Sequence, residues 1–234
     1  MMSSPVCLIV TSHLMFVDVS DITVSKRIEM LLDIARGMTY LHKRQPPIIH
    51  RDLTSFNILV DKDFHCKVAD FGMSRAKDMS NMTRQPGNLR WMAPEVTLQQ
   101  EYDEAADVFS FALIIWEVFS RNLPLHTLQP AQVSFALLHC LIFSVQAAGE
   151  MAYRDVRPPI LSADICPSAI TTLMQKCWAK DPKERPDFPS IVDFLLQAVE
   201  QQDVPHAPSS IPAPPLSDPY EQMDPTAKKS YVVV

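Results

Sequence analysis

The clearest amphipathic pattern in the chain runs from Ser25 to Lys43. Apolar residues recur there at the spacing of one helix face, and charged residues occupy the other face. Pro46 and Pro47 follow, and a proline disfavours helical backbone at the residue before it. The pattern therefore predicts a helix that packs one face on a core and ends before the two prolines.

Three later segments have patterns that predict further helices of the same domain. The segment Asp107–Phe119 is apolar nearly all round, which is typical of a helix buried at the centre of a domain. The segments Ser168–Lys180 and Phe188–Val199 are interpreted as two further helices. Helix is therefore the main regular structure that we expect.

Strands are predicted only in short places. Cys7–Thr11 is a β-branched and apolar run that indicates one buried strand, and Ile48–Ile49 indicates a second. Val60 and Val68 flank the polar turn Asp61–Asp63, which predicts a small hairpin. Sheet is thus a minor part of the expected structure.

Two segments lack such patterns. Residues 73–92 are rich in Ser, Asn, Gln, Pro and Gly and have the composition of a mobile loop. Beyond Gln202, Pro, Ser, Ala and Asp dominate, so we expect a disordered tail.

Composition and charge narrow the functional class. The 234 residues suffice for one sizeable core with tails, and the formal net charge of -6 gives no indication of nucleic-acid binding. The five cysteines form no C-x-x-C pair, which argues against a zinc site or a disulfide framework and favours a reducing, cytoplasmic setting. No stretch has the length and apolar character of a signal peptide or a membrane span.

Three motifs carry the candidate chemistry. The segment His50–Asn57 reads H-R-D-L-T-S-F-N, Asp70–Gly72 reads D-F-G, and Ala93–Glu95 reads A-P-E. In this order, they resemble the catalytic loop, the metal-binding loop and the end of the activation segment of protein kinases. The resemblance extends from about Val6 to Gln201.

This resemblance implies an α+β, mainly α fold. By the resemblance, this fold would be the C-terminal (large) lobe of a protein kinase, with only a remnant of the sheet of the N-terminal lobe. Residues 1–20 would hold the remnant strand and the hinge, residues 21–201 the large lobe, and residues 202–234 the proline-rich tail.

The resemblance also implies phosphoryl transfer from Mg²⁺-ATP to hydroxyl groups of protein substrates. Asp52 is the expected base that accepts the proton of the substrate hydroxyl, and Asn57 and Asp70 are the expected magnesium ligands. Oxygen ligands of this kind suit magnesium. The alternative interpretation of these side chains is a set of solvated surface groups.

By the same resemblance, the nucleotide lies against the remnant strand. Thr11 would be the gatekeeper residue, and Ser12–Leu14 would form the hinge that meets adenine. The residues expected to contact ATP are Thr11, His13, Leu14, Leu59 and Asp70. The alternative is an orphaned hydrophobic strand with no binding role.

The resemblance assigns Arg51 to the activation segment. Its guanidinium is expected to bind a phosphate there, which would order that loop. Candidate phosphate acceptors are Ser74, Ser80 and Thr83, with Thr83 preferred because it lies in the centre of the loop.

Four residues are expected to support the site without reacting. His50 would pack beneath the metal-binding loop, and Asp107 would accept hydrogen bonds from the backbone of the catalytic loop. Glu95 and Arg185 would form a buried ion pair.

Two further segments indicate which group of protein kinases the chain resembles. Residues 87–95 and 151–160 are similar to the tyrosine kinase-like group, near the relatives of the cardiac troponin I-interacting kinase. Such kinases mostly modify serine or threonine, and some are dual-specific. Thr54 departs from the common pattern, because serine/threonine kinases usually have lysine at this position. The change would weaken stabilisation of the γ-phosphate unless Asn88 or another group compensates.

Glycine is scarce. The chain has four glycines, and no three of them cluster as the glycine-rich loop of a kinase requires. No V-A-I-K strand precedes the catalytic loop. We therefore expect an N-terminally truncated kinase with little or no activity alone. The alternatives are a non-catalytic isoform that acts as a binding module or scaffold, and an incomplete gene model of an active kinase.

The segment Val133–Gln146 has no counterpart in the family, and its removal would join Gln132 smoothly to Ala147. We interpret it as an insertion from alternative splicing or a retained intron; the alternative is an extended amphipathic helix. The tail carries short motifs for SH3, SH2 and PDZ domains, each of which is otherwise a solvated linker. They are Pro212–Pro215, Tyr220–Met223 and Val232–Val234.

Overall fold

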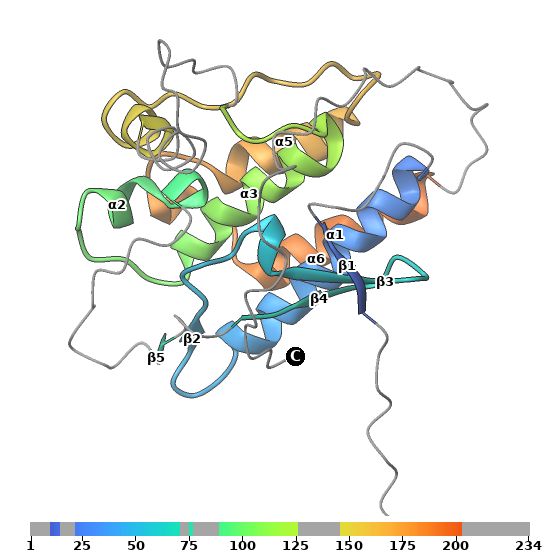
Figure 1. Cartoon of the computed structure of the whole chain (residues 1–234), viewed down its shortest axis with the longest axis horizontal. Helices are drawn as coiled ribbons and strands as arrows, with labels where there is room; N and C mark the ends of the chain where they lie inside the picture. Colours follow the sequence, from blue (N-terminus) through green and yellow to red (C-terminus); the bar gives the residue numbers. More distant parts are fainter. Residues whose placement is uncertain (1–9, 15–21, 71–74, 77–88, 126–145, 203–234) are drawn as a thin grey trace, which may run out of the picture.

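The computed structural model describes residues 10–14, 22–70, 75–76, 89–125 and 146–202 (Figure 1). Its helices are α1 (Val24–His42), α2 (Pro94–Thr97), α3 (Ala105–Ser120), α5 (Ser168–Cys177) and α6 (Phe188–Gln202), and residues 146–153 are also helical. Its strands are β1 (Val10–His13), β2 (Ile48–Ile49), β3 (Ile58–Asp61), β4 (Cys66–Val68) and β5 (Arg75–Ala76). Short 3-10 helices are η2 (Ser55–Asn57), η4 (Leu89–Trp91) and η5 (Pro182–Glu184).

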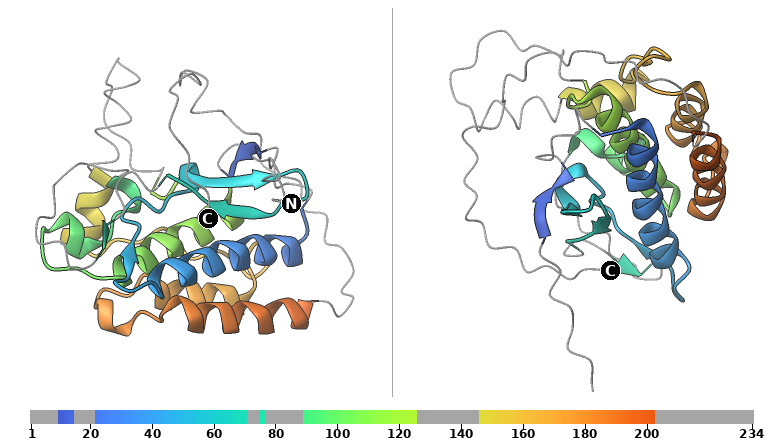
Figure 2. Two further views of the ribbon diagram at one scale, coloured as in Figure 1. Left: turned by 90° about the horizontal axis from the view of Figure 1, so that it is seen from below. Right: turned by 90° about the vertical axis from the view of Figure 1, so that its right-hand side faces the viewer.

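The helices and strands are arranged in layers, and most of the regular secondary structure is helical. Figure 2 (left) shows the β3–β4 hairpin above α1 and α3, with α5 and α6 on the other side of these two helices. The mainly helical fold with a small sheet is therefore confirmed for the described residues.

Helix α1 follows the predicted amphipathic pattern to within one residue at each end. Thr23 caps its N-terminus, where its side chain accepts a hydrogen bond from the Lys26 amide at 3.2 Å. One face packs along α6, and another lies against β4. At Gly37 a Cβ atom would lie only 3.2 Å from Cγ2 of Val68, so glycine allows the hairpin to approach the helix closely.

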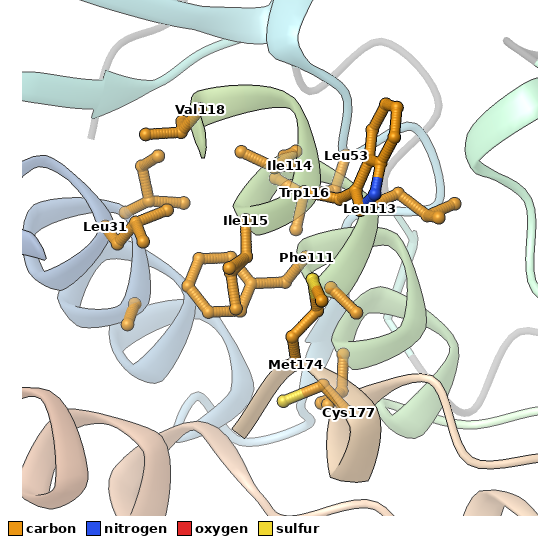
Figure 3. Packing of buried hydrophobic residues seen from close by; sticks show 14 of the residues in the cluster. Leu31, Leu53, Phe111, Leu113, Ile114, Ile115, Trp116, Val118, Met174 and Cys177 are labelled. Atoms are coloured by element: carbon orange, nitrogen blue, oxygen red, sulfur yellow. The ribbon is translucent and has the colours of Figure 1, made fainter. Parts of the chain in front are cut away.

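Helix α3 forms the centre of the core, as its apolar sequence predicts. Fourteen of its residues are buried. Figure 3 shows Phe111 and Ile115 of α3 between Leu31 of α1 and Met174 of α5. Because apolar burial is the main favourable term in folding, this helix holds the helical layers together.

The two last helices differ from their predicted limits. Helix α5 ends at Cys177, three residues before the predicted end at Lys180, and Pro182 soon follows. Helix α6 begins at Phe188 as predicted but continues to Gln202. Its long contact with α1 explains the extension, because packing stabilises helical turns that local sequence does not specify.

The main sheet has the antiparallel order β1–β3–β4. The hairpin β3–β4 and the strand at Ile48–Ile49 are confirmed, and β5 pairs with the latter. The predicted start of the first strand at Cys7 lies outside the described residues. Its predicted end at Thr11 is wrong, since β1 continues through Ser12 and His13, two residues assigned to the hinge. These residues pair with Val60 and Leu59 of β3, whose open edge extends the strand.

Three predictions fall outside the described residues. They are the disordered tail with its motifs, most of the mobile loop, and the insertion apart from its last residue. Gln146, the last residue of that segment, is helical and is continuous with Ala147 in the helical residues 146–153. No helix in the described part of the chain is long and apolar enough to cross a bilayer.

Candidate active site

The catalytic-loop segment is attached to the core through the carboxylate of Asp107. This residue lies in the first turn of α3 and is 1% exposed. Its Oδ2 accepts hydrogen bonds from the His50 amide at 2.8 Å and from Nε2 of His42 at 2.9 Å. Its Oδ1 accepts from the Arg51 amide at 2.9 Å. The expected bonds from the backbone to Asp107 are therefore present.

These hydrogen bonds also decide the charge state of Asp107. Burial by itself raises the pKa of its carboxyl, but the hydrogen bonds and charges of His42 and His50 outweigh burial and lower the pKa below its ordinary value. The ionised carboxylate holds Arg51 in the left-handed backbone region, with φ of 70°. That conformation costs a non-glycine residue about 1–2 kcal/mol, so the charged acceptor offsets local strain.

His50 connects this segment to the predicted metal-binding loop. Its fully buried ring places Nε2 at 3.1 Å from the carbonyl oxygen of Ala69. A carbonyl only accepts, so Nε2 carries the proton. Ala69 in turn donates its amide to the Asn57 carbonyl at 2.8 Å. His50 thus lies against the loop that leads into Asp70.

The predicted base and the first predicted metal ligand are in direct contact. Asn57, at the end of η2, donates from Nδ2 to Oδ2 of Asp52 at 2.9 Å and to its carbonyl oxygen at 2.7 Å. The amide nitrogen is therefore turned toward Asp52. The other amide atom, the oxygen Oδ1, is the one suited to a cation.

The donor set fits magnesium. Asn57 offers a neutral oxygen and Asp70 a carboxylate, and the Ala69–Asn57 backbone bond keeps the two residues close. Asp70 has a φ of 62°, a strained conformation of the kind that clusters at functional sites. Magnesium is commonly held by one or two carboxylates together with phosphate oxygens. In the described residues no three His, Cys, Asp or Glu side chains group into a metal site by themselves.

Of the residues predicted to contact ATP, Thr11, His13 and Leu59 lie in the β1–β3 pair, Leu14 directly follows β1, and Asp70 follows β4. His13 pairs with Leu59, and the backbone of Thr11 lies in the same strand. Leu14 and Leu59 are buried. The side chains of Thr11 and His13 lie outside the described part, so their role at the nucleotide stays a prediction.

The activation segment is described only in part. The guanidinium of Arg51 lies 5.9 Å from the centre of the Tyr102 ring, a cation–π distance. The predicted phosphate acceptors Ser74, Ser80 and Thr83 lie outside the described residues.

The expected ion pair between Glu95 and Arg185 is present. Two parallel hydrogen bonds of 2.6 and 2.9 Å join the guanidinium to the carboxylate. Arg185 also donates to the carbonyl oxygens of Ala105 and Ala179, each at 2.9 Å. The pair therefore ties the start of α2 to the start of α3 and to the segment after α5.

A small pocket opens beside the predicted base. It is lined by the catalytic-loop residues 51–54 together with Trp91, Met92 and Ser110. Thr54 is 1% exposed, and its Oγ1 has no hydrogen-bond partner among the described residues. The pocket is about the size of one water molecule, so beside Asp52 it has room for a hydroxyl group but not for a whole side chain.

Sequence reasoning missed two polar residues near this site. His42 ends α1 and binds Asp107, and Glu117 lies buried within α3. A signal for Glu117 was available, because a lone acid in an otherwise apolar helix needs buried partners. No comparable pattern marked His42, since a histidine near a helix end is common.

Comparisons with known proteins agree with this geometry. The family model for protein tyrosine and serine/threonine kinases matches residues 12–195. The serine/threonine-protein kinase TNNI3K of Mus musculus is 45% identical over 172 residues, which cover 72% of this chain and 19% of that protein. The serine/threonine-protein kinase CTR1 of Arabidopsis thaliana is 37% identical over 195 residues, which cover 82% of this chain and 21% of that protein.

A third relative, the serine/threonine-protein kinase STY17 of Arabidopsis thaliana, is 39% identical over 175 residues, which cover 74% of this chain and 28% of that protein. The chain thus spans less than a third of the length of each of these relatives. Its match to the family model, however, extends over most of its own length. The chain therefore belongs to the protein tyrosine and serine/threonine kinase family, as a catalytic domain of the tyrosine kinase-like type.

Proposed function

We propose that these residues transfer the γ-phosphoryl group of Mg²⁺-ATP to serine or threonine hydroxyls of cytoplasmic signalling proteins. The contact that carries this proposal is the pair of hydrogen bonds by which Asn57 orients the Asp52 carboxylate. A base fixed in this way is positioned for a substrate hydroxyl, and positioning supplies much of the rate in phosphoryl transfer.

In the proposed reaction, Asp52 accepts the proton of the substrate hydroxyl. The hydroxyl oxygen forms a bond to the γ-phosphorus while the bond from that phosphorus to the β–γ bridging oxygen breaks, which releases ADP. Asn57 and Asp70 would hold magnesium, which supplies positive charge next to the phosphate oxygens. Asp107 acts indirectly, because it fixes the backbone from which Asp52 projects.

The choice of serine or threonine rests on the relatives, which are described as serine/threonine kinases. Tyrosine remains the alternative acceptor, because Thr54 replaces the lysine usual in serine/threonine kinases. A peptide library that presents all three hydroxyl residues separates these substrates.

A second candidate function is a binding module without turnover. The observation that favours it is the scarcity of glycine, since no glycine-rich cluster is available to cover the phosphates. We propose that the 234-residue chain assayed alone turns over slowly or not at all.

The test is a phosphotransfer assay with magnesium and labelled ATP on the whole chain, beside Asp52→Asn and the control Asp63→Asn. Asp63 is an exposed residue of the hairpin turn, so its variant should behave as the wild type. Turnover that Asp52→Asn abolishes supports the base assignment, and turnover that persists in this variant contradicts it. Binding of substrate proteins in a pull-down without any turnover supports the second function.

A further inference from the structure

Glu117 is a buried acid that the proposed reaction does not use. It lies in α3 among apolar residues and is 7% exposed. A buried carboxyl is costly unless its oxygens have partners, so its contacts indicate why an acid stands at this position.

Each oxygen of Glu117 binds a different segment of the site. Oε1 lies 2.9 Å from the hydroxyl of Ser55, the residue that follows Thr54 at the start of η2. Oε2 accepts a hydrogen bond from Nε1 of Trp91 at 2.7 Å. The rings of Phe56 and Trp91 also meet edge to face, 5.7 Å apart.

The pocket beside Asp52 is lined by residues from both segments, which we call its two walls. One consists of residues 51–54, which lead directly into Ser55, and the other consists of Trp91 and Met92. We infer that Glu117 is a positioning residue, whose carboxyl group holds the two walls of this pocket at a fixed separation. The inference rests on the proposed function, because it takes the pocket to be the place where the substrate hydroxyl meets Asp52.

The proton on Glu117 decides how the two walls are joined. Burial raises the pKa of Glu117 to about 8, although the hydrogen bonds of Trp91 and Ser55 and the charge of Arg90 act in the opposite direction. Arg90, itself buried and bonded to the Pro124 carbonyl, is the charged group that acts on this carboxyl in the described part of the chain.

The carboxyl therefore carries its proton at neutral pH. The indole of Trp91 can only donate, so Oε2 remains the acceptor and the proton lies on Oε1, from which it is donated to Ser55. When the proton is lost, the hydroxyl of Ser55 must turn and donate to Oε1 instead. The direction of one bond between α3 and the catalytic loop thus reverses as the pH passes through about 8.

Nuclear magnetic resonance of the whole chain tests this inference without requiring turnover, so an inactive chain does not affect the result. The chain has three tryptophans, and Trp91→Phe assigns the indole signal of Trp91. We expect this signal, and the backbone amide signals of Thr54 and Met92 in the two walls, to shift together with a midpoint near pH 8.

Glu117→Gln should remove the shift in all three signals. Its amide imitates the protonated acid, since the oxygen accepts from Trp91 and the nitrogen donates to Ser55. The control Glu200→Gln removes an acid from an exposed position of α6 and should leave the shift intact.

Three results would overturn the inference: signals that do not move in the wild type, a shift that persists in Glu117→Gln, or a shift confined to the indole of Trp91. If Glu117→Gln does not fold, Ser55→Ala replaces it as the test. This variant keeps the acid but removes a hydrogen bond that favours the charged form, so the midpoint should rise. An unchanged midpoint would count against the inference.

Discussion

Replacing Asp107 by asparagine should destabilise the fold far more than the loss of one charge suggests. The carboxylate accepts three hydrogen bonds, two at Oδ2 and one at Oδ1. An asparagine has only one oxygen. If that oxygen takes the place of Oδ2, the amide nitrogen faces the backbone N–H of Arg51, and two donors then oppose each other in a buried site.

The size of the effect can be worked out from these contacts. A hydrogen bond to a charged acceptor contributes about 1.5–3 kcal/mol, and a buried donor without an acceptor costs about 1–3 kcal/mol. Arg51 would also lose the bond that holds its left-handed backbone conformation. We therefore expect Asp107→Asn to lower the free energy of unfolding by about 3–5 kcal/mol.

Urea unfolding followed by circular dichroism measures this difference. The matched control is Asp193→Asn, the same chemical change at an exposed position of α6, which should stay within about 0.5 kcal/mol of the wild type. Because the pKa of Asp107 is lowered in the fold, its contribution is complete above the ordinary value of 3.8 and is lost as the pH falls through the folded value. A loss below about 1 kcal/mol at neutral pH would refute the proposed role of the charged acceptor.

The remaining predictions concern the ion pair, the unpaired hydroxyl and the buried thiols. Glu95→Gln breaks the buried ion pair with Arg185 and should lower the free energy of unfolding in urea by about 3–5 kcal/mol. Glu150→Gln breaks the partly exposed pair with Arg154 and should lower it by less than about 1 kcal/mol. Equal losses in the two variants would contradict this expectation. Thr54→Val removes a buried hydroxyl that has no partner in the described part of the chain, so the melting temperature should not fall; a clear decrease would contradict this expectation. Burial raises the pKa of the Cys166 thiol to about 11 and also raises the pKa values of the Cys66 and Cys177 thiols. Alkylation at pH 8 should therefore label these three residues only after unfolding, which mass spectrometry would detect.

The sequence predicted the elements whose pattern is local. Helix α1 shows one apolar face and is closed by prolines, and α3 is apolar nearly all round, so both could be placed to within two residues. The motif residues Asp52, Asn57 and Asp70 could be found because the chemistry requires those residue types in a fixed order.

Features that depend on contacts between distant segments could not be predicted in this way. The end of β1 was misplaced because the edge of β3, not the composition of Ser12 and His13, extends that strand. The bond from His42 to Asp107 joins residues 65 positions apart in the sequence. Glu117 stands out as a lone acid in an apolar helix, but its partners Ser55 and Trp91 come from distant segments and could not be named from that pattern.

The position of Asp107 and Glu117 on one helix has a consequence for how the site tolerates change. Both residues reach the catalytic loop from α3, ten positions apart, so helical rise fixes their spacing at about 15 Å along the axis. Lengthening or shortening the chain beyond Ser120 leaves this spacing unchanged. Deleting a single residue between the two would rotate one attachment by about 100° relative to the other. Helix α3 therefore fixes the distance between the two attachment points of the catalytic loop. We expect related chains to show no insertions or deletions between the positions of Asp107 and Glu117.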